Sequence, residues 1–186
     1  MSEIAEELKL TYTDILSLGE SNQRMELFDG DFVMAAMPNF IHQYIATQIS
    51  FTLTSYVKER KLGYVLGSPV DVLLTKHTVL QPDVSFLSHE RSYINDGKKF
   101  NGAPDLVVEI LSESTEERDR TFKFHEYARG GAKEYWLVSP DDEEIEVYQN
   151  SEKGFQLVKI FQKDETMNTP LFPDAEFDLS EVFLRN

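Results

Sequence analysis

The stretch Ala103-Pro104-Asp105-Leu106-Val107-Val108-Glu109-Ile110-Leu111 decides the fold class of this 186-residue chain. Its apolar residues follow a proline and form one short run, a pattern typical of a buried strand. Glu109 lies inside the run between Val108 and Ile110, so we expect its carboxylate to be partly buried. A buried carboxylate without a partner is unfavourable, so the position requires a cation, a metal ion or a proton.

A second acidic strand precedes the first one in the chain. Gln81-Pro82-Asp83 opens this strand, which is predicted over residues 84–87. In the 103–111 strand, side-chain alternation places Asp105 on the same face as Glu109. Two carboxylates on adjacent strands suit Mg²⁺, which takes hard oxygen ligands and usually one or two protein carboxylates. A structural ion pair at Glu109, and ordinary Pro-Asp strand openings at Asp83 and Asp105, remain alternatives.

The residues after this strand predict a helix over 115–129, ended by Gly130-Gly131. Lys123 lies in that helix, and an ammonium near the carboxylates can orient or deprotonate water and offset phosphate charge. A solvated pair with Asp119, one turn earlier, is the alternative. If the helix runs back across the Glu109 strand, we expect the Lys123 nitrogen within direct or one-water reach of Glu109 or Asp83.

The elements around this core are short and alternate in type. Apolar spacing predicts an amphipathic helix over residues 40–60, and Asp29-Gly30 predicts a hairpin between 25–28 and 31–34. A capping box predicts a short helix over 11–18. Further strands are expected at 64–66, 70–75, 106–111 and 134–138, with another hairpin at 145–148 and 155–161. The central order predicts an α/β (α+β) fold with a mixed sheet flanked by helices, and residues 1–186 are predicted to form a single domain.

Composition excludes several classes of site. The chain has no cysteine, which excludes disulfides and thiolate metal ligands and favours a cytoplasmic location. The net charge of −15 ordinarily disfavours nucleic-acid binding, but residues 1–31 and 134–186 hold most of the excess acid. Residues 58–99 and 118–133 are mildly basic. Residues 32–56 carry no charge, yet polar residues interrupt the apolar run, so we expect no membrane span.

Taken in order, these residues resemble the Uma2 family, a group of proposed restriction endonucleases in the PD-(D/E)XK nuclease superfamily. The resemblance extends from about Tyr12 to Tyr148. It is carried by residues 26–30, 81–84, 103–112, Arg118-Asp119, Lys123 with Tyr127, and 131–138. It implies a restriction-endonuclease-like sheet with additional β-hairpins.

The resemblance also implies roles for individual residues. Asp83 and Glu109 would be the metal carboxylates for Mg²⁺, or Mn²⁺ as its substitute, with the Ile110 carbonyl as a further ligand. Leu111 stands where the superfamily has a lysine, which assigns that role to Lys123. Glu26 matches a motif position and could contact the metal or its water, or be a surface acid of the hairpin.

His42 is a secondary candidate for phosphate contact or proton transfer. A lone histidine in an amphipathic helix can equally be a hydrogen-bonded structural residue.

Three functions are compatible with this pattern. The leading hypothesis is a Mg²⁺-dependent DNA endonuclease, a homodimer because cutting both strands needs two sites, with weak and salt-dependent DNA binding. The second is a nuclease-fold binding module without turnover, favoured by the missing strand lysine and the charge of −15. Two-carboxylate glycoside hydrolysis is disfavoured, because no cluster of exposed aromatic residues suits a sugar cleft.

Overall fold

A six-stranded mixed sheet forms the centre of the computed structural model, which describes residues 9–19, 24–34 and 37–183. The strand order is β10-β9-β8-β7-β6-β3. Only β7 and β8 pair in parallel among these strands, and the chain between them forms the helical crossover predicted from sequence. The predicted fold class is therefore confirmed. The strands of this sheet are β3 (Gly63–Gly67), β6 (Val84–Ser88), β7 (Leu106–Ile110), β8 (Glu134–Ser139), β9 (Glu144–Ser151) and β10 (Gly154–Gln162).

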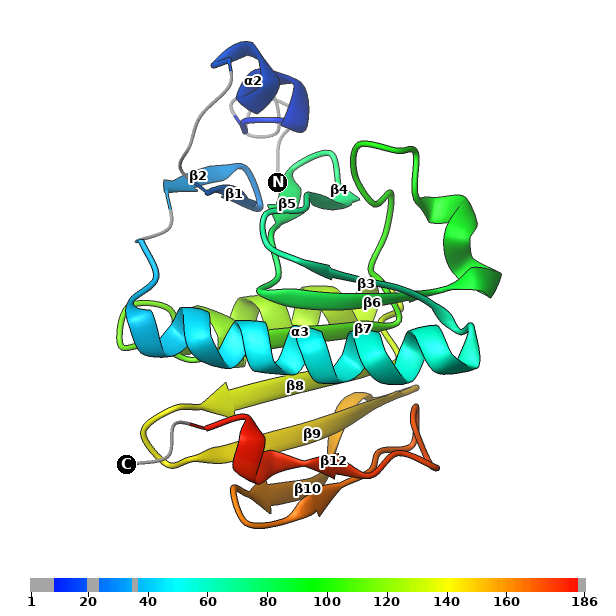
Figure 1. Ribbon diagram of the computed structural model, residues 1–186. Coiled ribbons are helices and arrows are strands. Elements are labelled where there is room, and N and C mark those ends of the chain that lie inside the picture. The colour runs from blue at the N-terminus through cyan, green and yellow to red at the C-terminus, as the bar shows by residue number, and fades with distance from the viewer. Residues whose placement is uncertain (1–8, 20–23, 35–36, 184–186) are drawn as a thin grey trace.

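Helices cover both faces of this sheet. The helix α3 (Phe40–Arg60) crosses in front of it in Figure 1, and the crossover segment lies behind. The Asn39 side chain caps α3 by accepting a hydrogen bond from the His42 amide, 2.9 Å away. The crossover contains α4 (Glu116–Arg118), a π-helical turn η2 (Asp119–Lys123) and α5 (Phe124–Arg129). The predicted helix over 115–129 is thus confirmed, although the π turn is not readable from its sequence.

Side-chain alternation divides the core into two layers. Val108 and Ile110 face α3, whereas Val107 and Leu111 face the crossover helices. Glu109 therefore lies on the crossover side, among apolar neighbours. The layer beneath α3 also contains Trp136, which is fully buried.

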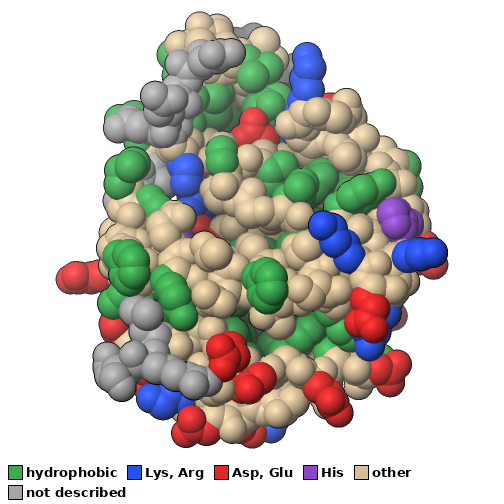
Figure 2. Space-filling model, in the orientation of Figure 1, with side chains coloured by type: hydrophobic (Ala, Val, Ile, Leu, Met, Phe, Trp, Pro, Cys, Tyr) green, Lys and Arg blue, Asp and Glu red, His purple; other side chains and the backbone are tan. Residues whose placement is uncertain are grey.

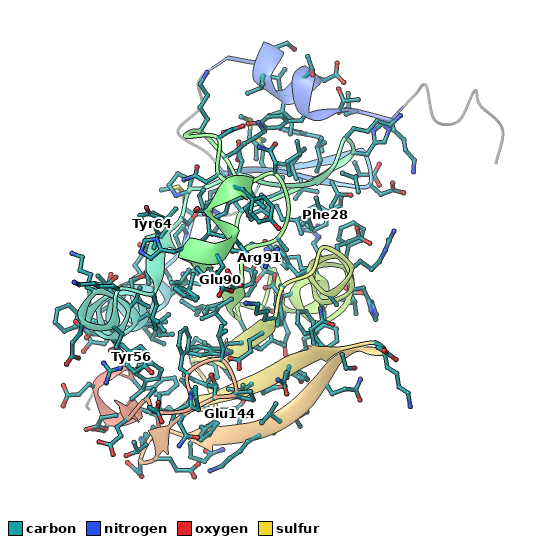
Figure 3. The ribbon with its side chains drawn as sticks, turned by 90° about the vertical axis from the view of Figure 1, so that its right-hand side faces the viewer. Phe28, Tyr56, Tyr64, Glu90, Arg91 and Glu144 are labelled. Atoms are coloured by element: carbon teal, nitrogen blue, oxygen red, sulfur yellow. The ribbon has the colours of Figure 1, made fainter. Side chains whose placement is uncertain are left out.

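A smaller sheet brings the N-terminal part of the chain to the crossover helices. Its order is β2-β1-β5-β4, and α2 (Tyr12–Ser17) lies above it in Figure 1. Phe28, labelled in Figure 3, packs against Phe122 with ring centroids 5.1 Å apart. This contact holds β1 against the η2 turn. The predicted hairpin at Asp29-Gly30 is confirmed as β1 and β2, whereas β5 was not predicted. The strands of this sheet are β1 (Met25–Phe28), β2 (Asp31–Met34), β4 (Val72–Thr75) and β5 (Thr78–Leu80).

The C-terminal segment closes the core beneath α3. It contains β11 (Thr166–Met167), β12 (Phe177–Asp178) and η3 (Leu179–Glu181). The remaining short helix, η1 (His89–Ile94), lies in the middle of the chain and follows β6. Tyr56 of α3 packs edge-on against Phe172 and Phe177, at centroid distances of 5.5 and 5.3 Å. None of the helices among the described residues is long and apolar enough to cross a membrane.

The acidic excess predicted for residues 134–186 is visible on the surface. On the face drawn in Figure 2, most acidic side chains lie below α3, over the C-terminal strands. Hydrophobic side chains lie along α3 itself, where Phe40 and Phe51 are 73% and 70% exposed. The region above α3 is therefore the less acidic part of this face.

Replacing Gly63 with alanine is expected to destabilise the fold by about 1–3 kcal/mol, because an added Cβ would overpack the β3–β6 pairing. That Cβ would lie 2.0 Å from the Leu87 carbonyl oxygen, which belongs to the backbone and cannot rotate away. Urea denaturation measures the loss. The matched control is Gly67→Ala in the same strand, where the backbone is not left-handed and the nearest atoms to the new Cβ lie at the ordinary contact distances of 3.8 and 3.9 Å. Equal stability in the two variants would contradict the prediction.

Candidate functional site

Strand pairing brings the two predicted carboxylates together. Val84 pairs with Val108 in antiparallel register, so Asp83 and Glu109 follow as neighbours across the two strands. The Ile110 amide donates a 2.8 Å hydrogen bond to Asp83 Oδ2, which fixes the carboxylate at the end of β7. Both carboxylates are nearly inaccessible, with exposed fractions of 5% and 1%.

These residues line a cleft of about 680 Å³ at this end of the sheet. The walls come from β1, the start of α3, the ends of β6 and β7, and the crossover helix. Five predicted site residues line it, namely Glu26, His42, Asp83, Glu109 and Lys123, together with Arg24 and Asp119. The sequence prediction of one shared site is therefore supported by the geometry.

Lys123 lies at the centre of an acidic cluster. Its Nζ is 3.2 Å from Glu109 Oε1, 3.1 Å from Asp119 Oδ1 and 3.4 Å from Glu26 Oε1. The side chain is 4% exposed, so the solvated alternative does not hold, although the pair with Asp119 is present. The predicted reach from Lys123 to Glu109 is confirmed.

The π turn sets the direction of this lysine. Asp119 and Lys123 begin and end η2, and both side chains point into the buried cluster. The Tyr135 hydroxyl donates a 2.9 Å hydrogen bond to the Asp119 carbonyl, which anchors the turn to β8. π turns inside helices are often found at functional sites.

One ammonium among three carboxylates leaves the cluster acid-rich. Burial raises the pKa of Glu109 well above its usual value, because Lys123 offsets only part of the effect and Asp119 adds like charge. Burial also raises the pKa of Asp119. Burial alone would lower the pKa of Lys123, but the charges of Glu109, Glu26 and Asp119 raise it well above its usual value. The lysine is therefore firmly protonated.

Asp83 has a different set of partners. Arg24 Nη1 lies 2.7 Å from Oδ1, and His42 Nε2 lies 3.1 Å from Oδ2. Burial would raise the pKa of Asp83, but the His42 hydrogen bond and the Arg24 charge lower it well below its usual value. Both carboxylates therefore have cationic neighbours, Arg24 and His42 at Asp83 and Lys123 at Glu109. Arg24 was missed because it lies outside the motifs.

The remaining candidates have distinct positions. Glu26, carried by β1, accepts a 2.8 Å hydrogen bond from the Gln81 amide at Oε1, so it belongs to the site and is not a surface acid. Asp105 is not brought to the site. It lies at the opposite end of β7, where Lys133 Nζ is 2.8 Å away and the Ser88 amide donates a 2.8 Å hydrogen bond. Its role is structural.

The donor set fits a small, hard cation. Asp83 and Glu109 offer carboxylate oxygens, and Glu109 Oε1 has no hydrogen-bond partner among the described residues despite the proximity of Lys123. Mg²⁺ usually takes only one or two protein carboxylates. Among residues 9–19, 24–34 and 37–183 no three acidic or histidine side chains form a metal-binding group. Water and substrate oxygens would therefore have to complete the coordination.

Comparison with known proteins agrees with this architecture. A protein from Synechocystis, "Uncharacterized protein slr1290", is 28% identical over 149 residues, which cover 78% of this chain and 76% of that protein. A crystal structure of a "putative nuclease belonging to DUF820" from Anabaena variabilis superposes with a TM-score of 0.78 at 22% identity, covering 94% of this chain and 97% of that one. It shows the same fold. The model of the family Uma2, described as "Putative restriction endonuclease", matches residues 11–180, so this chain belongs to the Uma2 family.

Proposed function

We propose that this protein is a Mg²⁺-dependent nuclease that hydrolyses phosphodiester bonds in DNA. The observation that carries the proposal is the 3.2 Å approach of Lys123 to Glu109 inside a cleft that also contains Asp83. Two carboxylates beside a protonated lysine are suited to holding a cation and to stabilising negative charge on phosphate. The family description and the nuclease named in the Anabaena comparison support the same chemistry.

Each residue has a defined task in this proposal. Asp83 and Glu109 would hold Mg²⁺, with the Ile110 carbonyl as a further ligand. The bound ion would supply Lewis-acid polarisation of the phosphate. Because its pKa is raised, Lys123 stays protonated at neutral pH and therefore acts as a hydrogen-bond donor and charge partner, not as a base. Glu26 lies 3.4 Å from Lys123 and positions its ammonium.

Cleavage of supercoiled plasmid tests the function directly. With Mg²⁺ or Mn²⁺ present, the wild-type chain is expected to nick or linearise the plasmid, and Glu109→Gln is expected to lose at least about 100-fold in rate, since one of two ligand charges is removed. Asp105→Asn is the acid control outside the site. Equal rates for wild type and Glu109→Gln would refute the proposal.

A binding module without turnover is the second candidate, and one observation favours it. Both oxygens of Asp83 already accept hydrogen bonds or ion pairs, from Arg24, His42 and the Ile110 amide. Such a module would bind DNA in EDTA as well as in Mg²⁺ and would leave plasmid intact under both conditions. Metal-dependent cleavage would exclude it.

The proposal includes a homodimer, because cleavage of both strands of a duplex requires two sites. It also includes weak DNA binding, because few basic side chains are available to contact phosphates.

Lys98 is exposed and lines a second cleft that adjoins the site. Lys98→Glu is expected to weaken DNA binding several-fold and to reduce its salt dependence, because a phosphate contact is lost. Fluorescence anisotropy at several salt concentrations measures both. Lys153→Glu, in the β9–β10 turn, makes the same charge change elsewhere, and equal losses in the two variants would show that Lys98 makes no specific contact.

A further inference from the structure

Arg24 stands between two clefts. The second cleft, of about 890 Å³, extends from the site between α3 and residues 67–71. Five residues line both clefts, namely Arg24, Met37, Pro38, His42 and Asp83. These residues form the wall between the two clefts, and its polar side chains are Arg24, His42 and Asp83.

The guanidinium of Arg24 is held by two acceptors. Its Nη1 donates to Asp83 Oδ1 at 2.7 Å, and its Nη2 donates to the Gln81 carbonyl. The Nε atom is buried and has no hydrogen-bond partner within the described part of the chain. Arg24 lies just before β1 and outside its ladder, which starts with the Met25–Met34 pair. The side chain is thus bound mainly through its charged end.

Arg24 and a metal ion would compete for Asp83 Oδ1. A carboxylate offers about four lone-pair sites, and three contacts to Asp83 come from Arg24, His42 and the Ile110 amide. A divalent cation approaching Oδ1 would meet both an occupied oxygen and the positive charge of the guanidinium. Arg24 must therefore leave Oδ1 before this carboxylate can serve as a ligand there.

We propose that Arg24 occupies the cation position at Asp83 in the metal-free protein and moves to a phosphate oxygen of the nucleic acid when Mg²⁺ binds. This inference rests on the proposed nuclease function and assigns to it a residue that couples metal binding to substrate binding. A planar guanidinium with several donors matches phosphate oxygens well. Its place in the wall gives it access to a strand lying in either cleft.

The proposal predicts changes of opposite sign in one variant. In Arg24→Gln, Mn²⁺ affinity measured by calorimetry is expected to rise about tenfold, because a charge-assisted hydrogen bond no longer has to be broken. DNA affinity in Ca²⁺ is expected to fall about fivefold, because a phosphate contact is lost. Arg129→Gln, an exposed arginine paired with Glu126 outside both clefts, is the matched control and should change neither value.

The outcomes separate this inference from the proposed function. If wild type binds Mn²⁺ and Arg24→Gln binds it equally or more weakly, Arg24 is only a clamp for Asp83 and the inference fails alone. If neither protein binds Mn²⁺, the metal site itself fails and the inference with it. If only Arg24→Gln binds Mn²⁺, Arg24 prevents metal binding at Asp83 in the wild-type protein, and the inference is supported.

A measurement on the wild-type chain covers the case in which Arg24→Gln does not fold. Arginine side-chain NMR should show a rotationally restricted Arg24 guanidinium without metal, and faster rotation after Mg²⁺ is added. The resonance is assigned by its loss in Arg24→Lys. An unchanged Arg24 signal at saturating Mg²⁺ would overturn the proposal.

Discussion

Replacing Lys123 with methionine is expected to lower the free energy of unfolding by about 3–5 kcal/mol, because removing one partner of a buried charge cluster leaves the others uncompensated. Glu26, Glu109 and Asp119 would then share a nearly inaccessible pocket without a cation. DNA cleavage should be lost, whereas Mg²⁺ affinity should persist, since an ammonium is not a ligand. Urea denaturation and calorimetry measure the two effects.

The pH dependence of this loss has a definite direction. The folded-state pKa values of Glu109 and Asp119 are raised, so these acids take up protons first as the pH falls. Protonation removes the repulsion that Lys123 compensates, and the difference between wild type and Lys123→Met should therefore shrink toward acidic pH. Lys153→Met is the control for a surface lysine. A loss below about 1 kcal/mol, the range of exposed ion pairs, would contradict the burial of this cluster.

Replacing Asp83 with asparagine is expected to abolish Mn²⁺ binding and to destabilise the metal-free protein by about 3 kcal/mol. The second effect arises because Arg24 and His42 lose their shared carboxylate. Since the pKa of Asp83 is lowered in the folded state, its contribution is fully present above the unfolded value and is lost as the pH falls through the folded value. Thermal melts should therefore show the same difference between wild type and variant at pH 7 and pH 5, and a smaller difference only below the ordinary aspartate pKa of 3.8.

Glu109→Gln provides the matched comparison with Asp83→Asn. The pKa of Glu109 is raised on folding, so wild-type stability falls as the pH rises from the unfolded value toward the folded one. Glutamine removes that fall, and the metal-free variant should be equally or more stable at pH 7 while also losing Mn²⁺ binding. If both variants lose the same stability at pH 7, the opposite pKa shifts of Asp83 and Glu109 are contradicted.

Short-range patterns predicted most of the fold. The run over 103–111, the Asp29-Gly30 hairpin and the apolar spacing of residues 40–60 all correspond to elements of the structure, because each depends on neighbouring residues only. The strand β5 escaped prediction because it has three residues and no alternation of apolar and polar side chains. The π turn in the crossover helix has no signal in the neighbouring residues, and the hydrogen bond to its Asp119 carbonyl comes from Tyr135, 16 residues away.

The sequence predicted which residues form the site better than it predicted the ion pairs and hydrogen bonds between them. Asp83, Glu109 and Lys123 were identified from motif positions, and strand register brings them together. The pairing of Asp83 with Arg24 joins residues 59 positions apart, and Arg24 carries no local signal in the sequence. Sequence spacing likewise placed Asp105 on the Glu109 face, but the length of the strand separates the two ends.

The π turn over Asp119–Lys123 makes the length of this helix a functional quantity. A π turn holds one more residue than an α turn, and each residue of an α-helix turns the chain by about 100°. Removing one residue within the turn would leave Asp119 and Lys123 three positions apart on a regular helix, which would change their angular separation and the direction from which the ammonium approaches the carboxylates, although neither side chain had been altered. Insertions and deletions in this segment should consequently be far less tolerated than substitutions on its outer surface. The orientation of the Lys123 ammonium depends on the number of residues in the segment as well as on their identity.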